Sequence, residues 1–327
     1  MSSSKRVVVI GGTGHIGTFL VPRLVRAGHD VVNISRGSRR AYADAPEWER
    51  VRQVVADREQ EDREGTFPNR VAALDPDVVV DLVCFTLESA TALVERLRGS
   101  DVHLVHCGSI WRAGPSEVLP ITEDTMTAPF GTYGIEKDRI ARMLKQETSD
   151  GGVATTSLHP GHISGPGWAP IGPVGNLDPS VWRTLSAGEP LAIPGLGAET
   201  MAHVHADDVA QAFELAVEHR DAAAGEDFSV VAADALNVRG YAALAASWFG
   251  QEARLESVSW DRFRETTDQD AAQASWEHLS RSQVFSIEKA RRLLGYEPRH
   301  TAGETVEEAI RWLVEHGELE GTRPLSL

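Results

Sequence analysis

Short apolar runs alternate with amphipathic segments along the first 160 residues. The runs cover residues 7–10, 31–35, 51–56, 77–82, 102–106 and 154–158. Runs of this length predict buried strands of a parallel sheet. Segments 15–27, 88–98 and 133–146 place apolar residues at helical spacing and predict helices between those strands. The alternation predicts an α/β fold with a doubly wound parallel sheet of the Rossmann type.

The pattern changes after residue 160. Residues 159–179 are rich in glycine and proline, which predicts a loop rather than the interior of a sheet. Segments 207–218, 239–248 and 301–316 then predict helices, with short strands between them. We therefore expect residues 1–165 to form the Rossmann domain, to which part of 204–232 returns. Residues 166–327 are expected to form mainly a smaller, mixed substrate-binding lobe.

Composition and charge limit the classes of function. Of the 327 residues, 42% are hydrophobic and 24% are charged, which suits a globular protein and excludes disorder for most of the chain. Acidic residues outnumber basic ones by 48 to 32, and the net charge of −16 would repel a nucleic-acid backbone. The only cluster of basic residues that we identify is a short one at 36–40, so we expect no nucleic-acid partner.

The cysteine content and the first five residues indicate in which cellular compartment we expect the protein. The two cysteines, Cys84 and Cys107, are too few for a disulfide framework and suit a reducing compartment. Residues 1–5 lack the apolar run of a signal peptide, and no run approaches the ~18 apolar residues of a membrane helix. We therefore expect a cytoplasmic protein without a membrane partner.

A glycine-rich motif, GGTGHIG at residues 11–17, lies between the first predicted strand and the first predicted helix. Glycines at this junction let backbone N–H groups approach a pyrophosphate, and the helix N-terminus adds partial positive charge. This context favours nucleotide binding over a purely structural turn. Gly11, Gly14, His15, Ile16 and Gly17 are the predicted pyrophosphate-binding residues.

The end of the second strand bears on the choice of cofactor. An acidic residue there would bind the ribose hydroxyls of NAD, whereas arginine suits the additional phosphate of NADP. Ser35 and Arg36 occupy this position, and no acid follows before Asp44. The sequence therefore favours NADP(H). NAD(H) stays open, because Arg36 could also belong to a solvated basic turn.

Tyr133 and Lys137 stand four residues apart, which places them on one face of a helix. A nearby cation lowers the pKa of a phenol, so we expect Lys137 to bring Tyr133 toward the working range of a general acid or base. Ser109 follows the fifth strand, at the edge where such sheets bind ligands. Its hydroxyl is predicted to hold a substrate oxygen beside Tyr133.

Together these residues resemble the extended short-chain dehydrogenase/reductase superfamily, which includes the NAD-dependent epimerase/dehydratase family. The resemblance covers nearly the whole chain. Besides the glycine motif and the serine, tyrosine and lysine, it rests on LHPGHISGP at 158–166, HVHADDVA at 203–210 and KARRLLGYEP at 289–298. Segments SRG at 35–37 and DR at 57–58 are also similar to bacterial relatives of the plastid RNA-binding branch.

The resemblance implies roles for individual residues. Ser109 would orient a carbonyl or hydroxyl, Tyr133 would act as general acid or base, and Lys137 would lower the tyrosine pKa and bind the nicotinamide ribose. Asp57 would contact the adenine, and Pro160 would lie beside the nicotinamide. No metal ion is expected.

Four residues depart from the family pattern. Ile110 and Trp111 follow the serine where dehydratases carry an acidic pair, which makes a 4,6-dehydratase an unsuitable assignment. Met201 stands where nucleotide-sugar enzymes usually place an arginine that grips the diphosphate. Arg183 and Arg281 are the alternatives for that grip. His159 replaces an arginine and is expected to be structural.

Three functions stay open on this evidence. The leading one is an NADP(H)-dependent oxidoreductase that acts on a ketone or secondary alcohol of a non-nucleotide small molecule, with Trp111, Trp168 and Trp182 suited to line an apolar pocket. The second is a nucleotide-sugar epimerase that retains NAD(P). The third is a non-catalytic nucleotide sensor or RNA-binding protein of the same fold. A small-molecule substrate is the expected partner, and a homodimer is left open.

Overall fold

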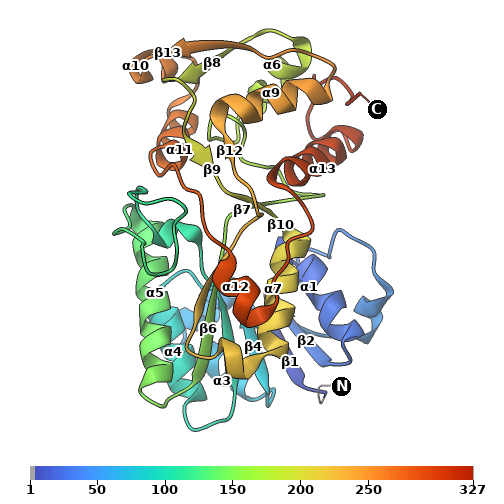
Figure 1. Ribbon diagram of the computed structural model, residues 1–327. Helices are drawn as coiled ribbons and strands as arrows, with labels where there is room; N and C mark the ends of the chain where they lie inside the picture. The colour runs from blue at the N-terminus through green and yellow to red at the C-terminus, as the bar shows by residue number, and fades with distance from the viewer. Residues whose placement is uncertain (1–3, 327) are drawn as a thin grey trace.

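The computed structural model describes residues 4–326 and has a sheet-containing lower part and a mainly helical upper part (Figure 1). The lower part holds a seven-stranded sheet whose recorded pairings are all parallel. Its order is β11-β6-β5-β4-β1-β2-β3. The strands are β1 (Arg6–Ile10), β2 (Asp30–Ser35), β3 (Arg52–Val55), β4 (Val78–Asp81), β5 (His103–Cys107), β6 (Ala154–Pro160) and β11 (Asp227–Val230). The predicted doubly wound sheet is confirmed.

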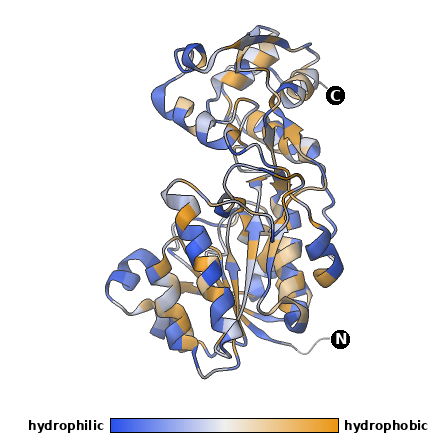
Figure 2. Cartoon of the chain, turned by 60° about the vertical axis from the view of Figure 1, so that its left-hand side comes forward, coloured by the Kyte–Doolittle hydropathy of each residue, from blue (hydrophilic) through white to orange (hydrophobic). Residues whose placement is uncertain are grey.

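Helices cover both faces of this sheet. One face packs against α1 (His15–Arg26), α7 (Ala206–Glu218) and α12 (Glu288–Leu294), and the other against α3 (Phe67–Ala72), α4 (Leu87–Leu97) and α5 (Thr132–Ser149). Alternate residues of β1 supply the two cores, since Val7 and Val9 join the first and Val8 and Ile10 the second. Figure 2 shows hydrophobic residues along the strands and the facing helix surfaces.

The strand order reverses at β1, which pairs with β2 on one side and β4 on the other. Ligands bind such sheets in the crevice beyond the carboxyl ends of the strands at this reversal. The glycine motif after β1 and the residues that follow β4 and β5 therefore all lie at this crevice.

The upper part has its own core, which includes the buried residues Trp182, Met201 and Tyr241. Its helices are α6 (Ser180–Ala187), α9 (Val238–Trp248), α10 (Trp260–Phe263), α11 (Gln269–Leu279) and α13 (Ala302–Glu315). Two small sheets pair β8 (Pro190–Pro194) with β13 (Arg254–Val258) and β9 (Thr200–Met201) with β12 (Leu236–Asn237). The remaining short elements are α2 (Arg58–Arg63), α8 (Arg220–Ala223), η1 (Pro46–Arg50) and η2 (Ile110–Arg112).

The prediction of a loop over residues 159–179 is wrong at its beginning. Strand β6 continues to Pro160, and β7 (His162–Ser164) pairs in parallel with β10 (His203–His205). A Cβ atom on Gly161 would lie 2.4 Å from the carbonyl oxygen of Ala202, so this glycine permits close approach of two chain segments.

No helix within residues 4–326 combines the length and apolar character needed to cross a bilayer.

Candidate functional site

The glycine motif forms a tight turn that leaves a helix N-terminus without a side-chain cap. Gly11 has a φ of +87°, and a Cβ atom on Gly17 would lie 2.2 Å from the backbone oxygen of Gly12. Helix α1 begins at His15, and its capping residue, Gly14, offers no side chain. The N–H of Thr18 donates to Gly14 O at 2.9 Å, so the helical bonds begin only after the first turn. This cradle fits an anionic pyrophosphate.

Asn33, which the sequence analysis missed, fixes the turn. It is fully buried in β2, where its Oδ1 accepts a hydrogen bond from Gly12 N at 2.9 Å. Its Nδ2 donates to Gln53 Oε1 at 2.7 Å. A lone amide within an otherwise apolar run was the available sequence signal, because a buried polar side chain needs partners.

The His15 side chain turns away from solvent and joins an aromatic cluster. Its ring stacks on Trp168, with ring centres 4.8 Å apart, and is hydrogen-bonded to the hydroxyl of Tyr42. Burial lowers the pKa of His15 to about 3, so the imidazole is neutral at physiological pH. The ring therefore offers packing rather than charge, and the adjacent Ile16 is also buried.

The residues predicted to hold the adenosine half lie along one sheet edge. Ser35 ends β2 and is paired in register with Val55 of β3, two residues before Asp57. Arg36 is exposed and forms no ion pair with the other residues that the structure describes. Asp57 is exposed and caps α2, where its Oδ1 accepts a hydrogen bond from Gln60 N at 3.1 Å.

A second feature that the sequence did not predict joins the start of α2, which follows β3, to the end of β4. Arg58 forms an ion pair with Asp81, a buried residue at the end of β4. Its guanidinium also lies 3.2 Å from Asp62 and donates to Ser89 Oγ at 2.9 Å. These partners hold Arg58 beside the sheet edge, so Arg36 remains the less constrained arginine there.

Ser109, Tyr133 and Lys137 lie together beyond β4 and β5. Ser109 caps η2, and its Oγ accepts a hydrogen bond from Trp111 N at 3.2 Å. Lys137, on α5, is only 1% exposed, and its Nζ donates to the carbonyls of Cys84 at 2.7 Å and Cys107 at 2.8 Å. The Nζ atom lies 5.7 Å from the centre of the Tyr133 ring.

Gly134 brings α5 against η2. A Cβ atom at this position would lie 2.4 Å from the carbonyl oxygen of Trp111. The ring centre of Trp111 also lies 6.0 Å from that of Tyr133 in an edge-to-face contact. The glycine beside Tyr133 therefore sets how closely the tyrosine helix approaches the segment that carries Ser109.

The pKa of Tyr133 is shifted in the direction opposite to the sequence-based expectation. Desolvation of the phenol raises its pKa to about 12, although part of the side chain is exposed, and the Ser109 hydroxyl acts in the lowering direction. Burial also lowers the pKa of the Lys137 amine. Tyr133 is therefore a protonated phenol at neutral pH, which suits it to give a proton.

His159, in strand β6, contacts the backbone of Ser109. Its Nδ1 accepts a hydrogen bond from Ser109 N at 3.3 Å, and its Nε2 lies 3.0 Å from Nη1 of Arg112. Arg112 is itself ion-paired to the buried carboxylates of Asp138 and Asp227. Burial lowers the pKa of His159 well below its usual value, which leaves the ring neutral. Its position is structural, as expected from the sequence.

The positions considered for a diphosphate grip are otherwise occupied. Met201 is 1% exposed and packs in the upper core. Arg281 is also 1% exposed, and its guanidinium lies between Trp111 at 4.0 Å and Phe130 at 3.8 Å. Arg183, on α6, lies against Gly321 near the C-terminus. The guanidinium of Arg281 is thus enclosed, and the stem of Arg183 packs beside Gly321, so a role of either arginine in binding a diphosphate stays a prediction.

The three tryptophans suggested as pocket residues have different surroundings. Trp182 belongs to the upper core and is 3% exposed. Trp111 contacts Tyr133 and also the ring of His278, at 4.8 Å. Trp168 stacks on His15 beside the glycine motif. Pro160 is buried at the end of β6.

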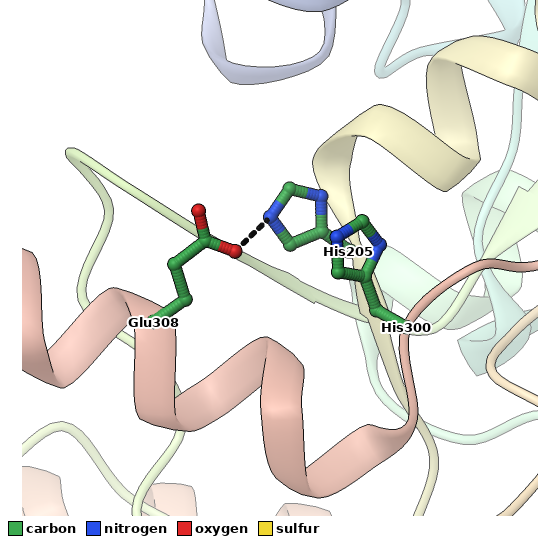
Figure 3. Close-up of side chains that lie close together, drawn as sticks. All are labelled: His205, His300 and Glu308. Atoms are coloured by element: carbon green, nitrogen blue, oxygen red, sulfur yellow. Dashed lines mark ion pairs between the residues drawn. The ribbon is translucent and has the colours of Figure 1, made fainter.

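His205, His300 and Glu308 bring potential metal ligands together (Figure 3). The two imidazoles stack with ring centres 3.9 Å apart and planes at 20°. Imidazole lone pairs lie in the ring plane, so nearly parallel stacked rings do not direct them at one ion. Asp207 N donates to His205 Nδ1 at 3.0 Å, which places the ring proton on Nε2, 3.2 Å from Glu308. The group therefore joins α13 to the start of α7.

Comparison with known proteins places the chain in a family. Residues 7–231 match the NAD dependent epimerase/dehydratase family. The chain is 32% identical to 2'-dehydrokanamycin reductase of Streptomyces kanamyceticus over 208 residues, a match that covers 63% of this chain and 56% of that protein. It is 27% identical to UDP-glucose 4-epimerase of Corynebacterium glutamicum, with 93% and 94% covered.

A third relative and one solved structure extend the comparison. The chain is 26% identical to chloroplast stem-loop binding protein of 41 kDa b from Arabidopsis thaliana, with 91% of this chain and 76% of that protein covered. The epimerase Mth375 of Methanothermobacter thermautotrophicus superposes with a TM-score of 0.74 at 22% identity, covering 97% and 94% of the two chains. The chain thus belongs to the NAD-dependent epimerase/dehydratase family and is an NAD(P)-dependent enzyme of the extended short-chain dehydrogenase/reductase type.

Proposed function

We propose that the protein is an NADP(H)-dependent oxidoreductase that acts on a ketone or secondary alcohol of a non-nucleotide small molecule. The observation that carries this substrate class is that Met201 is an uncharged side chain packed in the upper core, and that the guanidinium of Arg281 is enclosed between two aromatic rings. A hydrogen bond to a charged group is worth about 1.5–3 kcal/mol, so a nucleotide sugar would bind weakly without that grip. The similarity to 2'-dehydrokanamycin reductase supports a substrate other than a nucleotide sugar.

The proposed cofactor site uses the residues at the sheet edge. The uncapped backbone N–H groups of residues 15–17 would hold the pyrophosphate, and Ser35 and Arg36 would bind the additional phosphate of NADP(H). Asp57 would contact the adenine, and Pro160 would border the nicotinamide. Arg36 supports the preference for NADP(H), because it follows β2 directly and has no acidic partner among residues 4–326.

The proposed chemistry needs three side chains. When bound, NADPH supplies the hydride for a ketone. Ser109 Oγ holds the substrate oxygen, and the protonated Tyr133 donates its phenolic proton to that oxygen. Lys137 uses two of its three N–H donors on the Cys84 and Cys107 carbonyls, which leaves one for a ribose hydroxyl. Its positive charge stabilises the phenolate left on Tyr133.

A nucleotide-sugar epimerase that retains NAD(P) is the second candidate. It is supported by the similarity to UDP-glucose 4-epimerase, which extends over 94% of that protein. The third reading, an RNA-binding protein, draws on the chloroplast relative, but the net charge of −16 opposes it.

A thermal-shift panel separates the first two candidates. In the presence of saturating NADPH, we expect UDP-glucose, UDP-galactose and dTDP-glucose to add no stabilisation. A saturable shift with any of these sugars, together with interconversion of its epimers and no net change in the cofactor, would establish the epimerase instead.

A further inference from the structure

A pocket of about 290 Å³ lies in the upper part, away from Ser109, Tyr133 and Lys137. It is lined by Pro194, Gly195, Glu199, Trp260, Trp276, Leu279 and Ser280. The residues come from the end of β8, the start of β9 and the helices α10 and α11. One carboxylate and two indoles thus share a concave surface that the proposed reaction does not use.

Glu199 lacks the partners that a carboxylate normally has in a folded protein. Its Oε2 atom is buried and accepts no hydrogen bond, and the side chain forms no ion pair with any described residue. The Ser280 hydroxyl, which also lines the pocket, is buried without a partner. Unpaired buried polar atoms are uncommon, because each has lost its bonds to water. The Glu199 carboxylate therefore lacks a partner that an N–H donor of a ligand in the pocket could supply.

The two tryptophans narrow the ligand class. An indole face attracts a cation and also packs against the apolar face of a ring. Trp276 is 44% exposed, so a ligand can reach its ring. The net charge of −16 adds a long-range attraction for cations. A carboxylate beside aromatic faces is the combination that binds an ammonium group on a small ring.

The pocket is connected to the proposed reaction site by a row of contacts. The ring centre of Trp276 lies 5.5 Å from that of Phe130. The guanidinium of Arg281 lies 3.8 Å from the ring centre of Phe130 and 4.0 Å from that of Trp111. The ring centre of Trp111 in turn lies 6.0 Å from that of Tyr133. A ligand in the pocket and a ketone at Tyr133 would therefore lie at opposite ends of this row of contacting side chains.

We propose that this pocket binds the primary ammonium group of a small cyclic polar molecule, of the amino-sugar class. Glu199 pairs with the ammonium group, and Trp260 and Trp276 pack against that group and its ring. The binding itself does not depend on the proposed reductase function. Only the suggestion that the pocket holds the far end of the ketone substrate rests on that function.

The test uses a matched pair of ligands on the full-length protein. Glucosamine carries a cationic amine, whereas N-acetylglucosamine keeps the ring and removes the charge. Saturation-transfer NMR and calorimetry at low salt should detect glucosamine binding at least tenfold tighter than that of its N-acetylated counterpart. Glu199→Gln should remove at least nine-tenths of this preference, whereas Glu88→Gln, which removes an exposed carboxylate on α4, should leave it unchanged.

Trp276→Leu provides a second variant that tests the aromatic contact at a partly exposed position. It should weaken glucosamine binding while its melting temperature and NADPH affinity show that the fold is kept. Equal binding of the two sugars, or a preference that survives Glu199→Gln, would overturn the proposal. Because these are binding measurements, they succeed or fail whether or not the protein reduces a ketone.

Discussion

Lys137 donates a hydrogen bond to the carbonyl oxygen of Cys107 at 2.8 Å. Cys107 is the last residue of β5, two positions before Ser109. The lysine is thus anchored to the strand that delivers the serine, while its own helix carries Tyr133. This contact explains how residues from two distant parts of the sequence are held in one site.

Tyr133→Phe tests the proposed proton donor. Loss of a positioned general acid should reduce turnover by about 10² to 10⁴. NADPH affinity should stay within about twofold, because the phenol is assigned to the substrate oxygen rather than to the cofactor. Steady-state rates and calorimetry of NADPH binding check this. Full turnover in the variant would show that another group supplies the proton.

Lys137→Met should change three quantities together. The variant removes a buried charge that satisfies the carbonyls of Cys84 and Cys107, and each unsatisfied carbonyl costs about 1–3 kcal/mol. We expect a lower melting temperature, weaker NADPH binding and reduced turnover. If stability falls while cofactor affinity and turnover are kept, Lys137 is purely structural.

Arg36→Ala tests the cofactor preference. A charge-assisted contact with the additional phosphate is worth about 1.5–3 kcal/mol, so NADPH affinity should fall about tenfold or more while NADH affinity stays constant. Arg63→Ala serves as the control, because Arg63 is exposed on α2 and pairs with Glu59. Equal losses for both cofactors in Arg36→Ala would argue against recognition of the phosphate.

Acid should destabilise the fold through its buried neutral histidines. Burial lowers the pKa values of His15, His103 and His203 to about 3, against an ordinary value of 6.5. Between these values the unfolded chain binds protons that the folded chain does not, so stability falls as pH drops from about 6.5 toward 3. Each histidine contributes a slope of at most about 1.4 kcal/mol per pH unit.

Urea unfolding at pH values from 8 to 5 measures this slope. His103→Gln should reduce it, whereas His316→Gln, at an exposed position, should not. A free energy of unfolding that is constant between pH 7.5 and pH 5.5 would contradict the expected linkage.

Local patterns predicted those parts of the fold that depend on neighbours in sequence. The valine run of β4 and the glycine motif after β1 each carry their own signal, and the spacing of Tyr133 and Lys137 placed both on one helix. The roles of Ser109, Tyr133, Lys137, Arg36 and Asp57 stay predictions.

Features that depend on distant partners were not predictable in this way. The ion pair of Arg58 with Asp81 joins helix α2 to strand β4, and the enclosure of Arg281 depends on Trp111 and Phe130, which are far from it in sequence. The raised pKa of Tyr133 likewise reflects desolvation by the folded chain, which a spacing of four residues does not reveal.

The most direct test of the proposed function is the initial rate of NADPH oxidation with two panels of ketones. One panel holds non-nucleotide cyclic ketones, including keto-sugars with and without an amine, and the other holds nucleotide-linked 4-keto-sugars. We expect NADPH oxidation with at least one member of the first panel, a loss of about 10² or more in Tyr133→Phe, and no comparable rate with the second panel. Turnover confined to the nucleotide-linked ketones, at full rate, would contradict it.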